Sequence, residues 1–207
     1  MADRVTQAFA HRIIFIRHGQ TAFNASGRLQ GQSEVPLNAR GRDQASAIGR
    51  FLRGAYGDDM RRLDAAGAFW ASPLQRARET MELARAAMGL APQAYRCDAR
   101  LEELSFGVWE GLNWSEVAQR DPAGLQARLR DKWGFAPSGG ESYAALTQRV
   151  RQWLGERDGD CFVAAHGGTG RALMVLLGGL APEAADMADV WQGRAMIVEN
   201  GALAWVG

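Results

Sequence analysis

The stretch "RIIFIRHGQTAFN", from Arg12 to Asn24, starts with a mostly apolar run and then changes abruptly to Arg17, His18 and Gly19. The run is β-branched and aromatic, and it is too short for a helix. Its continuous apolar character is typical of a strand buried on both faces, as in a parallel sheet. His18, one of the three histidines of the chain, is therefore expected at the end of a buried strand.

Similar runs recur along the chain and alternate with helical patterns. "GAFWAS" (67–72) and "DCFVAA" (160–165) are predicted to be two more buried strands. Residues 114–133 predict two short helices broken at Asp121-Pro122. Longer helices are predicted from apolar residues at helical spacing and from end signals: 37–54, ended by Gly54; 72–89, with Ser72 as N-cap, Pro73 in first position and Gly89 at the end; 142–154; and an apolar helix after the glycine-rich turn at 167.

Strands that alternate with helices predict an α/β fold, a three-layer α/β/α sandwich around a mostly parallel sheet. The last segment, "RAMIVENGALAWVG", contains two strand-like runs joined by Asn200-Gly201, a strong hairpin signal. This hairpin should add an antiparallel edge to the sheet. We expect a single domain over residues 1–207, with a small helical lid insertion at about 107–140.

Composition narrows the classes of partner. The chain has 207 residues, a formal net charge of +1 and 47% hydrophobic residues. This near-neutral balance gives no reason to expect nucleic acid or a membrane as a partner. The first residues, "MADRVTQAFAHR", lack the apolar region of a signal peptide, and the two cysteines form no CxxC motif. We expect a cytoplasmic protein that is a monomer or a homodimer.

The predicted strand ends bring polar groups to one edge of the sheet. The first strand runs into Arg17 and His18, the second is followed one helical turn later by Arg76, and the third runs into His166 and Gly167. Ligands of such sheets bind beyond the carboxyl ends of the strands. Two histidines and two arginines are therefore expected to face one binding site.

This set of groups suits phosphate chemistry. Two guanidinium groups can clamp a phosphate dianion, and a helix that starts at Gly167 or Gly168 adds backbone N–H donors. A neutral histidine nitrogen is a competent nucleophile towards phosphorus, and nearby arginines favour the neutral form. The other histidine can stay protonated once the phosphate charge is present and donate a hydrogen bond to the phosphate oxygens. No metal-ligand cluster is evident in the sequence, so we expect neither a metal ion nor another cofactor.

A leaving oxygen also needs a proton donor. The segment "RLEELSFGVWEGL" (100–112) offers Glu102, Glu103 and Glu110. A carboxyl group beside Phe106 or Trp109 would hold its proton more readily than one in water and could act as a general acid. The residues alone leave the choice among the three glutamates open.

The motifs together resemble the histidine phosphatase superfamily, which has the phosphoglycerate mutase-like fold. "RHGQTAFN", "SPLQRARET", "LEELSFGVWEG", "PSGGES" and "AHGG" occur in the order expected of that family, over residues 12–170. The resemblance implies that His18 is phosphorylated transiently, and that Arg17, Arg76, His166 and Asn24 bind the phosphate. It also implies Glu103 as the proton donor, because this residue precedes the Phe-Gly pair by three positions.

Several residues could have a purely structural role instead of a role in substrate binding. Thr21 and Gly167 are candidates for substrate binding, although Thr21 could equally hold its loop together. Glu141 and Ser142 of "GGES" could cap the following helix as readily as touch substrate. Three aromatic residues of the lid could stack on a substrate or form the core of the lid, which we favour: Trp114, Trp133 and Phe135.

Three activities fit the resemblance. The first is a phosphomonoester hydrolase that acts on a small phosphorylated metabolite. The second is phosphotransfer of the phosphoglycerate mutase type, and the third is a non-catalytic phospho-ligand binder. The expected catalytic positions are all filled, which disfavours the third. Only about 35 residues separate Glu103 from Gly140, and they contain no adjacent arginine pair, whereas the resembling mutases have a longer segment with such a pair. We therefore expect hydrolysis. "FGVWEGL" further resembles small bacterial phosphatases of the α-ribazole phosphatase type, so α-ribazole 5′-phosphate or a sugar phosphate is a possible substrate.

Overall fold

A six-stranded sheet in the order β3-β2-β4-β1-β5-β6 forms the centre of the computed structural model, which describes residues 11–207. The expectation that residues 1–12 form no signal peptide falls almost entirely outside the described range, which includes only residues 11 and 12 of that segment. Strands β1 to β4 pair in parallel, and β5 and β6 are antiparallel, as expected. The strands are β1 (Ile13–Arg17), β2 (Phe69–Ala71), β3 (Arg96–Cys97), β4 (Cys161–Ala165), β5 (Ala195–Glu199) and β6 (Ala202–Val206).

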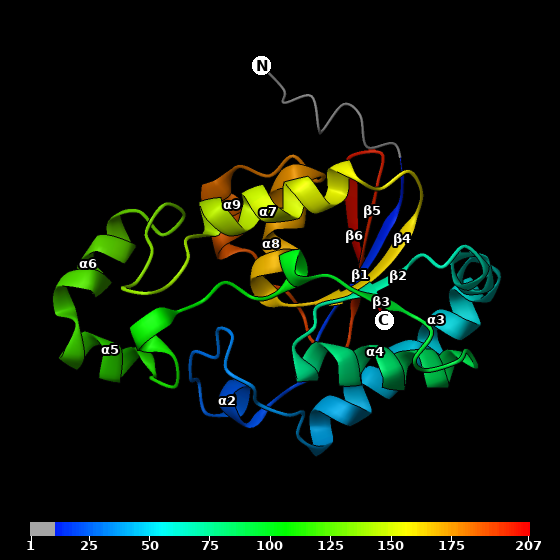
Figure 1. Ribbon diagram of the computed structural model, residues 1–207, viewed down its shortest axis with the longest axis horizontal. Helices are drawn as coiled ribbons and strands as arrows, with labels where there is room; N and C mark the ends of the chain where they lie inside the picture. The colour runs from blue at the N-terminus through cyan, green and yellow to red at the C-terminus, as the bar shows by residue number, and fades with distance from the viewer. Residues whose placement is uncertain (1–10) are drawn as a thin grey trace.

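Helices cover both faces of the sheet, and β1 shows why. Ile14 and Ile16 pack in one core cluster with α3 (Ala39–Ala65) and α4 (Gln75–Met88). Ile13 and Phe15 point to the other face, where a second cluster contains residues of α7 (Tyr143–Gly155) and α8 (Gly167–Leu176). Figure 1 shows these two helix pairs on opposite sides of the strands. The predicted three-layer sandwich is therefore confirmed, and each fully buried isoleucine or phenylalanine stabilises it by about 1.5–3 kcal/mol.

The strand register brings the polar strand ends together. Arg17 of β1 pairs with Ala165 of β4, and the next backbone N–H, that of His18, donates to the Ala165 carbonyl at 2.8 Å. On the other side of β4, the N–H of Ser72 donates to the Ala164 carbonyl at 3.0 Å. The three strand ends therefore lie side by side at one edge.

The C-terminal hairpin is confirmed. Asn200 and Gly201 have φ angles of 50° and 77°, the left-handed conformation that a two-residue turn of this kind requires. Glu199 pairs with Ala202 across the turn, and β5 pairs with β1.

The first long helix corrects the prediction that Gly54 would end it. Helix α3 continues to Ala65, with a kink at Tyr56, whose φ and ψ are −136° and 27°. Beyond the kink it buries Met60 and Leu63 in the core cluster that lies against β1. Burial of these two side chains outweighs the cost of a mid-helix glycine, about 0.5–1 kcal/mol.

Ser72 corrects a second prediction, because it does not cap the next helix. Helix α4 begins at Gln75, and its N-cap residue, Leu74, makes no side-chain cap hydrogen bond. The Ser72 hydroxyl instead contacts His166 at 2.7 Å and accepts a hydrogen bond from the Leu74 N–H at 3.3 Å. Gly89 ends α4 in the left-handed conformation, as expected.

Shorter helices complete the chain. Asp121-Pro122 breaks the 114–133 segment as predicted, because Pro122 starts a new helix and the Asp121 side chain accepts from the Gly124 N–H at 2.8 Å. Figure 1 shows α5 and α6 set apart from the helices that cover the sheet. Within residues 11–207, each helix is too short or too polar to cross a bilayer. The shorter helices are α2 (Ala22–Ala25), α5 (Trp114–Arg120), α6 (Pro122–Arg130), α9 (Pro182–Met187) and the 3₁₀ helices η1 (Ala99–Leu101) and η2 (Gly107–Trp109).

Candidate active site

A cavity of about 300 Å³ opens at the carboxyl edge of the sheet. It receives side chains from the end of β1, from α4, from the segment before η2, and from the first turns of α7 and α8. The sequence-predicted residues that line it are Arg17, His18, Asn24, Arg76, Glu103 and Gly167, together with Gly168. His166 is fully buried and absent from the cavity lining, but its ring centroid lies 5.2 Å from that of His18.

His18 is held in one orientation by its neighbour. Its Nδ1 lies 2.8 Å from the Gly19 carbonyl oxygen, which can only accept, so Nδ1 carries the proton and the Nε2 lone pair is left for the cavity. A side chain on Gly19 would bring its Cβ within 2.2 Å of the Gly41 carbonyl oxygen, so only glycine fits there. Burial, followed by the charges of Arg76 and Arg17, lowers the pKa of His18 well below its usual range. The ring is therefore neutral near pH 7.

Arg76 and Arg17 present buried guanidinium groups to the cavity. The two terminal nitrogens of Arg76 donate to the carbonyls of Ser33 and Gly31, at 2.9 and 2.6 Å. Arg17 donates to the Val190 carbonyl at 3.0 Å. The Nε atom of each arginine is buried with no hydrogen-bond partner. Burial without a partner is costly for such groups, so these donors are suited to an anion that enters the cavity.

His166 occupies the N-cap position of α8 but makes no capping hydrogen bond with its side chain. Its Nε2 lies 2.7 Å from Ser72 Oγ, and its Nδ1 is buried without a partner. The Ser72 hydroxyl oxygen already accepts a hydrogen bond from the Leu74 N–H, so its own O–H is available to donate to His166 Nε2. In that arrangement Nε2 is the acceptor and the ring proton lies on Nδ1. Burial and then the charge of Arg76 lower the pKa of His166 well below its usual range.

Glu103 lies against the first turn of α8. Its Oε1 accepts hydrogen bonds at 3.0 Å from the backbone N–H groups of Gly168 and Leu104, and Oε2 lies 3.2 Å from the Gly168 nitrogen. A Cβ on Gly168 would come within 2.2 Å of Glu103 Oε1, so the carboxylate depends on the glycine for its place.

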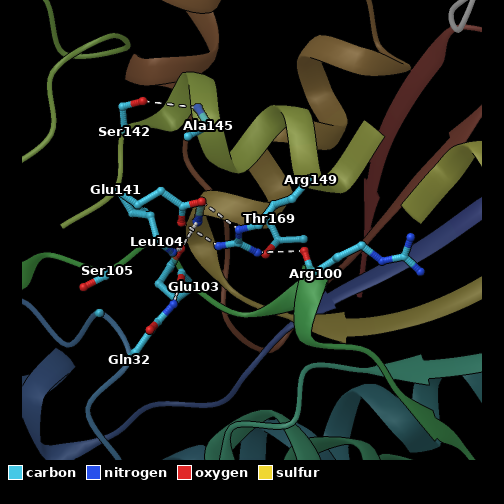
Figure 2. A network of polar contacts seen from close by, with 12 residues as sticks. Gln32, Arg100, Glu103, Leu104, Ser105, Glu141, Ser142, Ala145, Arg149 and Thr169 are labelled. Carbon is cyan, nitrogen blue, oxygen red and sulfur yellow. Dashed lines mark hydrogen bonds and ion pairs between the residues drawn. The ribbon is translucent and has the colours of Figure 1, made fainter. Parts of the chain in front are cut away.

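The backbone of the segment that carries Glu103 is fixed by side chains from both neighbouring helices, as Figure 2 shows. Arg149 of α7 donates to the Arg100 carbonyl at 2.7 Å and is itself held by two hydrogen bonds to Glu141. Thr169 of α8 donates to the Leu101 carbonyl at 3.3 Å, and Gln32 donates to the Glu103 carbonyl at 3.2 Å.

Asn24 is oriented by a small hydrogen-bond network. Its Oδ1 accepts from Gln192 Nε2 at 2.9 Å and from the Thr21 N–H at 3.2 Å, which turns the amide nitrogen away from these donors. Thr21 itself is fully buried, caps the short α2 helix and donates to Gln30 at 2.8 Å. It is absent from the cavity lining, and its hydrogen bonds hold the loop.

The remaining candidates lie outside the cavity or serve its walls. Glu110 accepts from Ser33 at 2.6 Å and from the Gln32 N–H at 3.0 Å, so it holds the 31–33 loop, and it is absent from the cavity lining. Ser142 caps α7, and Glu141 pairs with Arg149.

The three aromatic residues of the lid separate into two roles. Trp133 stacks on Tyr143 with ring centroids 5.2 Å apart, and Phe135 stacks on Trp109 at 5.4 Å. Both rings pack against a hydrophobic core cluster and neither lines the cavity, which agrees with the alternative favoured from the sequence. Trp114 differs, because it lines the cavity and is 41% exposed.

The sequence reasoning missed several cavity residues, among them Arg28, Tyr143 and Arg171. Arg171 lies one helical turn after Gly167, and that spacing is the signal that could have found it. Arg28 lies in the loop after α2, where it pairs with Glu116 at 2.8 Å, and no local pattern marks it. Residues 11–207 contain no group of three or more His, Cys, Asp or Glu side chains arranged to hold a metal ion.

Several curated proteins that are similar in sequence to this chain are named as phosphatases. A glucosyl-3-phosphoglycerate phosphatase of Mycobacterium tuberculosis is 33% identical over 181 residues, which cover 81% of this chain and 75% of that protein. A metal-independent phosphoserine phosphatase of Arabidopsis thaliana is 35% identical over 170 residues, covering 78% and 66%. Other curated relatives are longer: the chain spans 35% of a bifunctional protein of Mycobacterium tuberculosis, with 36% identity over 141 residues.

Solved structures show the same architecture. The α-ribazole phosphatase from Shigella flexneri superposes with a TM-score of 0.74 at 27% identity, covering 90% of this chain and 89% of that one. The mycobacterial glucosyl-3-phosphoglycerate phosphatase in complex with VO3 gives a TM-score of 0.75 at 26% identity, covering 95% and 97%. The family model of the histidine phosphatase superfamily (branch 1) matches residues 13–201. The chain therefore belongs to the histidine phosphatase superfamily, branch 1.

Proposed function

We propose that the chain is a metal-independent phosphomonoester hydrolase that acts on a small phosphorylated metabolite through a phosphohistidine on His18. The observation that carries this proposal is the neutral, oriented His18 ring beside the unpartnered Nε atoms of Arg17 and Arg76. Phosphatase names among the relatives support the same class of reaction.

In the first step, His18 Nε2 attacks the phosphorus atom in line with the leaving oxygen. The N–P bond forms as the P–O bond of the ester breaks, and protonated Glu103 gives its proton to the departing oxygen. Arg17 and Arg76 hold the equatorial oxygens, and His166 Nδ1 and the Gly167 N–H can add further donors. Donors fixed before the reaction stabilise the charge that develops in the transition state, because they need no reorganisation.

In the second step, Glu103 is ionised and takes a proton from a water molecule. The water oxygen attacks the phosphohistidine, the N–P bond breaks, and inorganic phosphate and neutral His18 are released. The same phosphate donors act in both steps. Asn24 contributes from the α2 side, where Gln192 and Thr21 orient its amide.

Hydrolysis accounts for the lid better than mutase chemistry. We propose that residues 107–140 form a lid within one domain that spans residues 1–207. The described lid consists of the short helices α5 and α6, joined directly at Asp121. Its residue Trp114 lines the cavity and is partly exposed, so the cavity wall meets solvent there, which suits hydrolysis. A mutase must exclude that water.

Relatives set the range of substrates we propose. They include glucosyl-3-phosphoglycerate, phosphoserine and α-ribazole phosphatases, so we propose a small phosphate ester, with α-ribazole 5′-phosphate or a sugar phosphate among the candidates. We also propose a cytoplasmic monomer or homodimer; Cys97 and Cys161 are free thiols, as expected in a reducing compartment.

Glu103→Gln tests the proposed chemistry with two esters that differ in their leaving group. Glutamine keeps the acceptor oxygen for Gly168 but cannot release a proton. The kcat for glycerol 3-phosphate should fall by about 10²–10⁴-fold. The kcat for p-nitrophenyl phosphate should fall far less, because p-nitrophenolate leaves without protonation.

Glu102→Gln is the matched control, since this neighbouring carboxylate does not line the cavity. It should leave both rates unchanged. An equal loss on the two esters, or the same loss in the Glu102 variant, would assign the proton to another group.

A further inference from the structure

The cavity contains more positive charge than one phosphate group requires. Arg17 and Arg76 already face the histidines, and Arg28 also lines the cavity but is paired with Glu116. Arg171 adds a further guanidinium. One carboxylate, that of Glu103, lines the cavity among the described residues. Unpaired charges are costly to bury, so a surplus of this kind indicates a second negative group on the ligand.

Arg171 connects the phosphate end of the cavity to the lid. It lies close to Arg17, since a Cβ placed on Gly167 would be 3.4 Å from Arg171 Nη1 and 3.6 Å from Arg17 Cζ. Its Nε is buried and has no hydrogen-bond partner. Its charge also reaches the lid, where it lowers the pKa of Arg128, after the larger effect of burial.

Arg128 is the lid residue on the other side. Its side chain starts from α6 and is only 5% exposed, and its Nη1 is buried without a hydrogen-bond partner. Its Cζ lies 5.3 Å from the Trp114 ring centroid and 5.9 Å from those of Phe106 and Tyr143. All three rings line the cavity. Contacts with ring faces offset part of the burial cost, but they leave the N–H donor of Nη1 unused.

The space beyond Trp114 can hold an organic group. A second cavity, of about 520 Å³, shares Trp114 with the first as a lining residue and is otherwise lined mainly by residues of α6 and α9. Arg128 and Lys132 line it, with the apolar side chains of Leu125, Leu129 and Met187. Lys132 is paired with Asp186, which leaves Arg128 as the cation without a carboxylate partner on this wall.

We propose that Arg128 and Arg171 form a second anion subsite, which binds a carboxylate or a second phosphate on the leaving-group side of the substrate. This inference rests on the proposed hydrolase function and narrows its substrate class to phosphate esters with a second acidic group. Guanidinium groups suit this task because they bind either anion through two parallel hydrogen bonds.

A matched pair of esters tests the subsite. 3-Phosphoglycerate carries a carboxylate where glycerol 3-phosphate carries a neutral hydroxymethyl group. Phosphate release should show a kcat/KM for 3-phosphoglycerate at least about tenfold higher, as expected for one charge-assisted interaction. Glycerol 1,3-bisphosphate distinguishes the two anions: a similar advantage for it shows that phosphate is also accepted, and the absence of one restricts the subsite to carboxylates.

Variants locate the subsite. Arg128→Gln and Arg171→Gln should each lower the ratio of the two kcat/KM values by about tenfold. Arg130→Gln is the matched control, because Arg130 is exposed two residues further along α6, and it should preserve the ratio. Thermal unfolding of each variant checks the fold, and the wild-type ratio decides the question if a variant does not fold.

Failure of the subsite can be told apart from failure of the function. Equal kcat/KM values for the two glycerol-based esters in the wild type would overturn the subsite while leaving the hydrolase intact. An unchanged ratio in both arginine variants would do the same. No phosphate release from any ester, including p-nitrophenyl phosphate, would contradict the hydrolase itself.

Discussion

Replacing Gly168 by alanine should displace Glu103 without breaking the fold. The new Cβ would stand 2.2 Å from Glu103 Oε1 and 2.7 Å and 2.8 Å from the ends of Leu146 and Leu104. These atoms are the free ends of flexible side chains, so they can give way. The carboxylate must withdraw by about 1.2 Å to reach a 3.4 Å contact, and its hydrogen bonds to the Gly168 N–H are strained or lost.

A misplacement of about 1 Å in a catalytic group can cost roughly 100-fold in rate. We therefore expect kcat for glycerol 3-phosphate to fall by about 100-fold in Gly168→Ala. The rate for p-nitrophenyl phosphate should fall much less, because that leaving group does not need the proton. Overpacking should also lower the free energy of unfolding by about 1–3 kcal/mol.

Gly54→Ala is the matched control. Gly54 lies inside α3, and a Cβ placed there meets nothing within 4 Å. Alanine should raise the free energy of unfolding by about 0.5–1 kcal/mol and leave both rates unchanged. Steady-state rates and urea unfolding measure these effects. An alkyl-ester rate in Gly168→Ala within twofold of wild type would refute the placement of Glu103 as the proton donor.

Two further predictions concern the histidines. Burial, followed by the charge of Arg76, lowers the pKa values of His18 and His166 well below 6.5, so the unfolded chain binds more protons below about pH 6.5. The free energy of unfolding should therefore fall as the pH is lowered from 6.5 to 5.5, by up to about 1.4 kcal/mol per histidine; urea unfolding measures the slope, and a flat profile would contradict the buried neutral rings. Ser72→Ala removes the 2.7 Å contact with His166 and should lower kcat by about tenfold for both esters alike; a change confined to the alkyl ester would point to an effect on the proton donor.

The strand ends could be predicted because their signal is local. Each of the strands β1, β2 and β4 is short and mostly apolar and has its polar residues at its end or within the next few positions. Parallel pairing then places the strand ends at one edge. The hairpin at Asn200-Gly201 was equally predictable, since the turn conformation depends on two adjacent residues.

What the sequence could not show depends on contacts between distant residues. Ser72 looked like a cap because its partner, His166, is 94 residues away. The extension of α3 past Gly54 depends on burial of Met60 and Leu63, which no local propensity records. The hydrogen bond from Gln192 to Asn24 joins residues 168 positions apart, so no local pattern could indicate it.

The burial of Arg128 also could not be predicted without the three-dimensional structure. In the sequence, Arg128 is one of several alternating charges on a short helix, a pattern typical of a solvated face. Only the folded chain shows its side chain buried against Trp114 and Tyr143.

The central claim is a phosphate bond to His18, and trapping that bond tests it most directly. The enzyme is mixed with ³²P-labelled substrate, quenched with alkali within the first turnovers, digested and analysed by mass spectrometry. We predict acid-labile, alkali-stable phosphate on the peptide that contains His18, and no incorporation or turnover in His18→Ala. Phosphate on another residue, or normal turnover by His18→Ala, would contradict the account.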